Sequence, residues 1–314
     1  MLKVSIIIPF LNEEENIYSL VDSLSNYFSN EKRFEVEVIF VNDGSTDASQ
    51  YKLIELPHKN YSCKLISLSK NFGSHSALRA GVKHATGDFI TFMYADLQDP
   101  ISLISEMFLK MAENHSNEII WATRRSTNNG FIESGFSKLY SNLMRKYVSS
   151  TYPKKGFDVV MFSKKVSKVI NQNIESNSSI FLQILTLGFK QDSINYDKQL
   201  RQKGVSKWTL SKKIKLFVDS FIAFSYAPIR FVTLIGIALF VIGFCFSTYL
   251  ICRKLLFDDL ESGWPMLISI ITLGFGITNI SLGIIAEYLW RTLDASRKRP
   301  VFIIDDIIEL TKNE

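Results

Sequence analysis

The sequence predicts an α/β protein with a doubly wound, mostly parallel sheet, followed by a strongly apolar segment. Three observations indicate this class. Short β-branched patterns alternate with helical patterns over the first 200 residues. Several of the strand patterns end in acidic or amide residues, which is the usual chemistry at the carboxyl edge of such a sheet. Two uncharged runs follow, each longer than the roughly 20 residues that cross a bilayer.

These patterns also divide the chain. We expect a cytosolic α/β domain over residues 1–200, and a loop with amphipathic juxtamembrane helices over residues 201–228. Two membrane helices over residues 229–290 and a cytosolic tail over residues 291–314 would complete the chain.

The first predicted strand is Lys3–Pro9, because β-branched residues dominate it and the proline ends it. A helix with acidic residues in its first turn follows and runs to Phe28. Its apolar positions lie on one helical face: Ile17, Leu20, Val21, Leu24 and Tyr27.

The second predicted strand, Val36–Val41, ends in a polar turn. Asn42 and Asp43 follow it directly, and Gly44 supplies the turn. Ser45 or Thr46 is then placed to cap the next helix. A third strand, Lys64–Leu68, leads through the residues Asn71–Gly73 into a helix over Ser76–Ala85.

The stretch Phe89–Pro100 begins as an apolar strand and ends in two carboxylates, a carboxamide and a proline. Pro100 can open the next helix at its first turn. Oxygen ligands from Asp96 and Gln98 suit Mg²⁺ or Mn²⁺, and such an ion suits a diphosphate. Alternatively, Asp99 caps the following helix and Asp96 merely ends the strand.

Parallel strands bring these polar ends together, since their carboxyl ends share one edge of the sheet. Asp43, the loop Asn71–Gly73 and Asp96 are therefore expected to line one crevice. The pattern continues with a helix over 101–112, a strand over 119–123 before Arg124 and Arg125, a helix over 133–148, a strand over 158–162, a helix after Lys164 and a strand over 191–196.

Two membrane helices are predicted from Phe231–Cys252 and Gly263–Ala286, which are 22 and 24 residues without a charge. Buried core helices are the alternative, but such helices rarely stay uncharged for so long. The basic flanks place both termini in the cytoplasm. These flanks are Lys198, Arg201, Lys203, Lys207, Lys212, Lys213 and Lys215 before the spans, and Arg291, Arg297, Lys298 and Arg299 after them.

The region 201–225 carries apolar residues at helical intervals among lysines, which is typical of a helix in the membrane interface. An ordinary surface helix is the alternative. Since the basic residues cluster beside the spans, nucleic-acid binding is not expected. The three cysteines and four histidines show no spacing typical of a disulfide framework or a zinc site.

Several motifs in order resemble the family 2 inverting glycosyltransferases with a GT-A fold. Within them the chain is similar to the polyprenyl-phosphate group related to dolichyl-phosphate mannose synthase and bactoprenol glucosyltransferases. The matching residues are Ile6–Glu13, Val41–Asp47, Asn71–Gly73, Ala95–Pro100, Gly204–Trp208, Glu287–Arg291 and Arg299–Pro300, together with the pair of spans.

The resemblance implies a role for each matched position. A nucleotide-sugar donor would contact Pro9, Asn12, Glu13, Asn42, Asp43, Gly44 and Asp96, and Asp96 with Gln98 would hold Mg²⁺ or Mn²⁺. Asp96, Arg124 and Arg201 would be catalytic. Arg124, Arg125, Arg201, Ser206 and Lys207 would face the acceptor phosphate. Tyr94 departs from the family, whose metal motif begins with an aspartate at that position.

The implied function is transfer of a hexose from a UDP-sugar to undecaprenyl phosphate at the bacterial inner membrane, with the catalytic domain in the cytoplasm. The product would serve cell-envelope polysaccharides. One alternative is transfer to a hydroxyl of a lipid-linked saccharide, and a second is a non-catalytic scaffold, suggested by Tyr94. The Gln-x-x-Arg-Trp motif of processive synthases is not found. Gly274, Gly276 and Gly283 would allow close packing in a homo-oligomer.

Overall fold

The computed structural model describes residues 1–114, 116–125, 141–146, 148–149, 151–153, 157, 159–173, 178–199, 264–296 and 300–310, with single positions at 234, 235, 238, 241, 245 and 249. The chain divides into two compact units. One comprises Met1–Ser220 with Pro300–Glu314, and the other comprises Phe221–Arg299.

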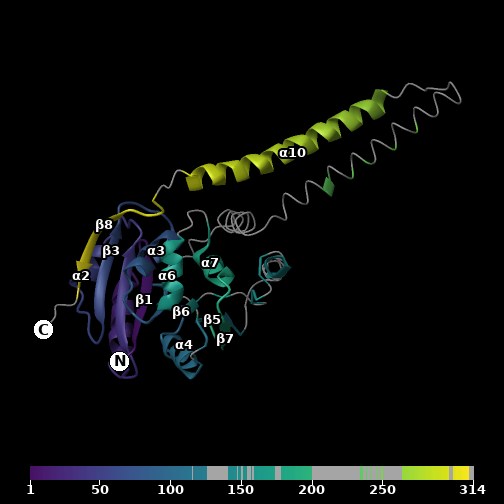
Figure 1. Cartoon of the computed structure of the whole chain (residues 1–314). Helices are drawn as coiled ribbons and strands as arrows, with labels where there is room; N and C mark the ends of the chain where they lie inside the picture. Colours follow the sequence, from purple (N-terminus) through teal and green to yellow (C-terminus); the bar gives the residue numbers. More distant parts are fainter. Residues whose placement is uncertain are drawn as a thin grey trace. The chain divides into compact units, whose positions relative to one another are not determined.

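The described strands of the first unit form one sheet of eight in the order β7-β5-β6-β4-β1-β2-β3-β8 (Figure 1). Their bounds are β1 Lys3–Phe10, β2 Glu35–Asn42, β3 Ser62–Leu68, β4 Phe89–Phe92, β5 Ile119–Arg124, β6 Val159–Ser163, β7 Gln191–Tyr196 and β8 Ile304–Glu309. The predicted parallel arrangement is confirmed for β3, β2, β1 and β4. In contrast, β6 and β8 run antiparallel to their neighbours.

Helices cover both faces of the sheet. This is required because successive side chains of β1 point to opposite faces and are apolar on both. Ile6 and Ile8 point into a core shared with α1 and α4, while Ile7 points to the other face. There a Cβ on Gly81 of α3 would overlap the Ile7 side chain, so glycine permits the close approach of this helix. The helices described in this unit are α1 Ile17–Phe28, α2 Ser49–Glu55, α3 Ser74–His84, α4 Ser102–Glu113, α6 Lys164–Gln172 and α7 Ile180–Thr186.

Three local expectations were wrong. Pro9 does not end the first strand, because β1 continues to Phe10 and loses at most one ladder bond so close to its end. Neither Ser45 nor Thr46 caps α2. Instead Asp47 Oδ1 accepts a hydrogen bond of 3.0 Å from Ser49 N. Pro100 also precedes α4, which begins at Ser102.

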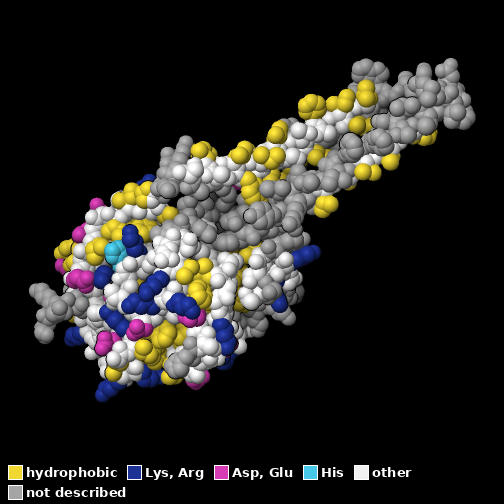
Figure 2. Space-filling model, in the orientation of Figure 1, with side chains coloured by type: hydrophobic (Ala, Val, Ile, Leu, Met, Phe, Trp, Pro, Cys, Tyr) yellow, Lys and Arg dark blue, Asp and Glu magenta, His cyan; other side chains and the backbone are white. Residues whose placement is uncertain are grey.

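The second unit contains α10, Trp264–Ser296, a 33-residue helix that includes most of the second predicted span. Large apolar side chains are exposed along it (Figure 2): Leu267, Ile270, Ile271, Phe275, Ile280, Leu282, Ile285, Leu289, Trp290 and Leu293. Taking the described residues alone, no helix is both long enough and apolar enough to cross a membrane. The first predicted span, apart from isolated positions, and the amphipathic region 201–225 lie outside the described residues.

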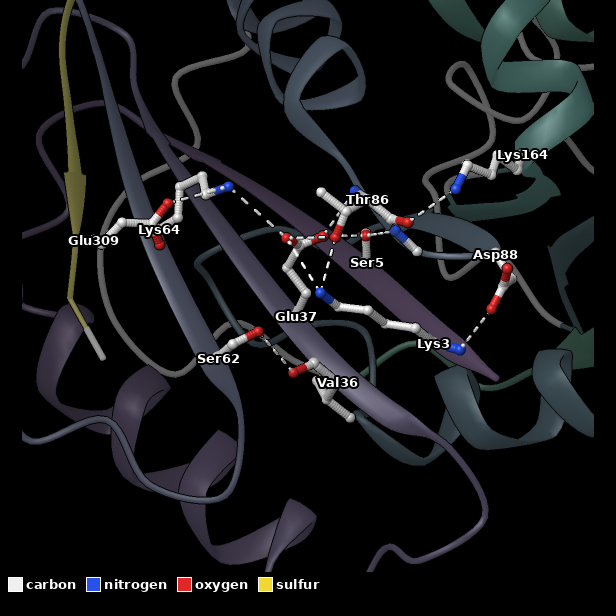
Figure 3. A network of polar contacts seen from close by, with 11 residues as sticks. Lys3, Ser5, Val36, Glu37, Ser62, Lys64, Thr86, Asp88, Lys164 and Glu309 are labelled. Carbon is white, nitrogen blue, oxygen red and sulfur yellow. Dashed lines mark hydrogen bonds and ion pairs between the residues drawn. The ribbon is translucent and has the colours of Figure 1, made fainter. Parts of the chain in front are cut away.

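A buried carboxylate organises the amino edge of the sheet (Figure 3). Glu37 of β2 is 4% exposed and accepts hydrogen bonds from Ser5 Oγ, Thr86 N and Thr86 Oγ1. The ammonium groups of Lys3 and Lys64 lie 3.6 and 3.9 Å from it. Burial alone would raise the pKa of Glu37, but these hydrogen bonds and the Lys3 charge hold the pKa below its ordinary value.

Candidate active site

The topology creates a switch point at the carboxyl edge between β1 and β4. The chain leaves β1 toward β2 on one side, whereas β4 pairs with β1 on the other side. Open α/β sheets hold their ligands at such points. Because β5 and β7 run in the same direction as β4, Arg124 and Tyr196 end their strands at this same edge.

Asp43, directly after β2, holds the loop that follows β3. Its Oδ1 accepts hydrogen bonds from Phe72 N at 2.8 Å and Gly73 N at 3.2 Å, and its Oδ2 accepts from Gly73 N at 3.0 Å. The side chain is buried, and burial raises the pKa of this carboxyl above its ordinary value although both N–H groups oppose the rise. The structure therefore joins the predicted Asp43 and Asn71–Gly73 through direct hydrogen bonds.

Gly44 lets the same loop approach still more closely. Its φ is +72°, and a Cβ there would lie 2.6 Å from both Asn71 N and Lys70 C. Both neighbours are backbone atoms, so neither can rotate away. A side chain at position 44 would therefore push loop 69–73, the residues Ser69–Gly73, away from the end of β2.

The loops after β1 and β2 are also hydrogen-bonded to each other. Asn12 N donates to Ser45 Oγ at 3.0 Å, and Asn12 Oδ1 accepts from Thr46 N at 2.8 Å. Asn12 has a φ of 52°, a conformation that asparagine adopts more readily than most residues. Ser45 N donates in turn to Asn42 Oδ1 at 2.8 Å. Thus Asn12, Asn42, Asp43 and Gly44 lie in one cluster of hydrogen-bonded loops, and their contacts with a nucleotide remain predictions.

Glu13 lies in the turn that starts α1. Its backbone N–H donates to Ser49 Oγ at 2.8 Å, and its Oε2 accepts from Asn16 Nδ2 at 2.7 Å. Pro9 is buried within β1. Nucleotide contacts by Glu13 and Pro9 remain predictions.

On the other side of β1, a sharp turn presents Asp96. Leu97 has a φ of 53°, and Gln98 N donates to Asp96 Oδ1 at 3.3 Å. The Asp96 and Gln98 side chains are partly exposed. This loop, residues 93–101, leaves the sheet beside β1, because Met93 N donates to Ile7 O at 3.0 Å.

Asp99 has different surroundings from Asp96. It is buried, and its Oδ1 accepts a hydrogen bond of 2.6 Å from the Tyr196 hydroxyl. Lys198 Nζ lies 3.7 Å from the same oxygen, and Gln199 N donates to Gln98 O at 2.8 Å. The segment after β7 therefore fixes loop 93–101. The sequence predicted the strand that ends at Tyr196 but not this contact, which joins residues far apart in the chain.

The structure describes two of the three arginines that are predicted to bind phosphate. Arg124 ends β5 opposite Tyr196 of β7 and is partly buried, which puts it at the edge where Tyr196 meets Asp99. Arg125 is exposed and lies 3.5 Å from the Asp197 carboxylate. Arg201, Ser206 and Lys207 lie outside the described residues, so their roles remain predictions.

The oxygen ligands that Asp96 and Gln98 can offer fit an ion such as Mg²⁺. No group of three His, Cys, Asp or Glu side chains able to hold a metal occurs in the described part of the chain. Mg²⁺ does not require one, since it often binds through one or two carboxylates with water and substrate phosphates as the other ligands. Asp96 and Gln98 are both partly exposed, so their side-chain oxygens fit this need.

A groove of about 810 Å³ lies beside this region, between α1 and the residues before α4. It is lined by Ser23 and Asn26 of α1 and by Leu97, Asp99 and Gln199 among others. It borders loop 93–101, and none of the residues that line it belongs to the cluster around Asp43.

The chain is similar to known proteins over most of its length. The profile of glycosyl transferase family 2 matches residues 5–171. A prophage bactoprenol glucosyl transferase homolog of Escherichia coli is 31% identical, over 96% of this chain and 98% of its own. The bactoprenol glucosyl transferase of Shigella phage SfV is 30% identical, over 96% and 98%.

A solved structure has a similar fold over most of the chain. The glucosyl-3-phosphoglycerate synthase of Mycobacterium tuberculosis, crystallised with Mg²⁺ and uridine diphosphate, superposes with a TM-score of 0.50 at 17% identity. The match covers 70% of this chain and 77% of the synthase. At this identity the likeness concerns the fold alone.

Proposed function

The chain belongs to glycosyl transferase family 2 and is a glycosyltransferase, and we propose that it transfers a hexose from a UDP-sugar to a polyprenyl phosphate. The observation that carries this proposal is the switch point, where the loop held by Asp43 and the turn of Asp96 flank the end of β1. Full-length relatives named bactoprenol glucosyl transferase support the choice of a lipid acceptor.

The donor nucleotide would bind against the cluster of Asn12, Asn42, Asp43 and Gly44. Hydrogen bonds already order these loops, so little conformational entropy remains to be lost when the nucleotide binds. The choice of a UDP-sugar as donor rests on the resemblance of the motifs Ile6–Glu13 and Val41–Asp47 to the family. Pro9 and Glu13 lie beside this cluster.

Asp96 and Gln98 would hold the divalent ion against the donor diphosphate. Bound there, Mg²⁺ or Mn²⁺ would neutralise the negative charge that develops on the leaving diphosphate. Arg124 ends a strand at the same edge, where a guanidinium can bind phosphate oxygens with two hydrogen bonds. Arg125, Arg201, Ser206 and Lys207 complete the proposed acceptor side.

A phosphate acceptor simplifies the chemistry. One of its oxygens attacks the anomeric carbon as the bond from that carbon to the diphosphate oxygen breaks, and the configuration inverts. The acceptor is already an anion near neutral pH, so no residue has to remove a proton. The protein must instead bring two anions together, which is a role for arginines and lysines.

Transfer to a sugar hydroxyl is the competing function, and it would require a general base. Asp99 is poorly suited to that role, because it is buried, accepts the Tyr196 hydroxyl and lies near Lys198. Asp96 would then have to serve as base while also binding the ion. These surroundings favour the phosphate acceptor.

Membrane attachment is a further part of the proposal. The apolar side chains exposed along α10 include Phe275, Leu282 and Trp290, and a polyprenyl acceptor resides in a membrane. The basic residues on both flanks of residues 229–290 would keep the catalytic domain and both termini in the cytoplasm. We propose a bacterial inner membrane as its location.

Radiolabelled UDP-hexoses incubated with the purified protein, Mg²⁺ and polyprenyl phosphate test the proposal. We expect an acid-labile radioactive lipid, and we expect Asp96→Ala to abolish it. Label that enters only an added lipid-linked saccharide would favour the hydroxyl acceptor. Equal activity without metal and in Asp96→Ala would contradict the proposed site, whereas no transfer from any donor would favour the scaffold.

A further inference from the structure

The segment after α10 returns to the sheet beside the loop that Asp43 holds. β8 pairs antiparallel with β3 (Figure 1). Ile304 lies opposite Leu68, the last residue of β3. One residue beyond, Ser69 N donates to Ile303 O at 3.0 Å. Ser69 is the first residue of loop 69–73. In the same loop, the N–H groups of Phe72 and Gly73 donate hydrogen bonds to Asp43.

Phe302 anchors this returning segment. Its side chain is 9% exposed, and Lys83 Nζ of α3 lies 5.9 Å from the centre of its ring. Since α3 begins at Ser74, loop 69–73 lies between two elements that the C-terminal segment contacts. Ile303 O accepts a hydrogen bond from the residue that starts the loop, and Phe302 lies near Lys83, which is in the last turn of the helix that follows the loop.

The carboxyl end of β8 is held to β3 by contacts that do not involve Phe302 or Ile303. Glu309 lies 3.3 Å from Lys64, which itself lies 3.9 Å from Glu37 (Figure 3). Leu310 N donates to Cys63 O at 2.9 Å. These contacts join β8 to the amino end of β3, away from loop 69–73. A change near Phe302 can therefore loosen the loop while the rest of β8 stays paired.

We propose that Phe302 and Ile303 are positioning residues for the donor nucleotide. They fix the start of loop 69–73, so that Phe72 and Gly73 meet Asp43 before the nucleotide binds. Without them the loop would have to be ordered on binding, and that ordering weakens affinity. The inference rests on the proposed donor site and adds a C-terminal element to it.

The test measures binding of UDP with Mg²⁺ to the full-length protein and to Phe302→Ala. We expect binding about fivefold weaker in the variant, the lower end of ordinary coupling between sites. Hydrogen exchange at Phe72 and Gly73 should become faster. Ile307→Ala is the matched control, because it shortens an exposed side chain on the same strand, and it should bind UDP like the wild type.

A melting curve for each variant identifies folded protein at the titration temperature. If Phe302→Ala is unfolded there, Phe302→Leu replaces it and must show a smaller loss in the same direction. Unchanged binding in the folded Phe302 variant, or an equal loss in Ile307→Ala, would overturn the positioning role. A wild type that fails to bind UDP would overturn the donor site and this inference with it.

Discussion

Gly44→Ala would test how the loops of the candidate site are held together. A left-handed conformation costs a residue with a Cβ about 1–2 kcal/mol, and Gly44 has a φ of +72°. The new Cβ would also lie 2.6 Å from two backbone atoms of loop 69–73, and forcing an extra methyl group into packed structure typically costs about 1–3 kcal/mol. We therefore expect a loss of roughly 2–5 kcal/mol of stability.

Gly188→Ala is the matched control. Gly188 has a φ of +76°, nearly the same as Gly44, but a Cβ there would meet nothing within 4 Å. It lies between α7 and β7, at the amino end of β7 and away from the candidate site. This variant should lose about 1–2 kcal/mol through its backbone conformation alone.

Urea unfolding and UDP titration of both variants separate the two effects. Gly44→Ala should be the less stable variant and should bind UDP about tenfold more weakly, which corresponds to 1.4 kcal/mol. Gly188→Ala should bind UDP like the wild type. Equal stabilities and equal UDP affinities in the two variants would refute the claim that Gly44 permits the loop contact.

Three further changes test other contacts. Glu37→Gln should lower the free energy of unfolding at pH 7 by about 1–3 kcal/mol, because the carboxylate that accepts hydrogen bonds from Ser5 and Thr86 becomes a neutral amide. Because the folded pKa of Glu37 lies below its ordinary value of 4.5, the difference from wild type in urea unfolding should shrink as pH falls through that folded pKa, and a constant difference would contradict this. Tyr196→Phe should lower the free energy of unfolding by about 1–3 kcal/mol, because Asp99 loses the hydrogen bond from the Tyr196 hydroxyl. The variant should also need more Mg²⁺ for activity. Unchanged stability and an unchanged Mg²⁺ dependence would contradict this role of Tyr196. Burial, with the nearby Arg79, lowers the pKa of His75 to about 4, so wild-type stability should fall as pH drops from 6.5 toward 4. His75→Phe should reduce that fall, and an identical acid dependence would count against the buried neutral histidine.

Much of the fold could be predicted from residue patterns. Buried parallel strands such as β1 and β2 are nearly continuous β-branched runs, and α1 has its apolar residues on one face. Strand direction was harder to predict, since β6 has the same apolar pattern as the parallel strands although it runs antiparallel to both of its neighbours. β8 was missed because this partly exposed edge strand mixes isoleucines with acidic residues.

The candidate site was predictable at the level of its location. Polar residues at strand ends predicted that Asp43, the loop Asn71–Gly73 and Asp96 share one edge of the sheet. The contacts were not predictable, because Asp43 bonds to the backbone N–H groups of Phe72 and Gly73, which carry no side-chain signal. The Tyr196–Asp99 hydrogen bond likewise depends on how β7 lies relative to loop 93–101.

The most direct test of the account compares two acceptors that differ in one group. The full-length protein, Mg²⁺ and a panel of UDP-hexoses would be incubated with polyprenyl phosphate or with the matching polyprenol, and the lipids analysed by mass spectrometry. We predict a polyprenyl phosphate bearing one hexose, and no product from the polyprenol. A hexose on the polyprenol, or polyprenyl phosphate unchanged with every donor, would contradict the account.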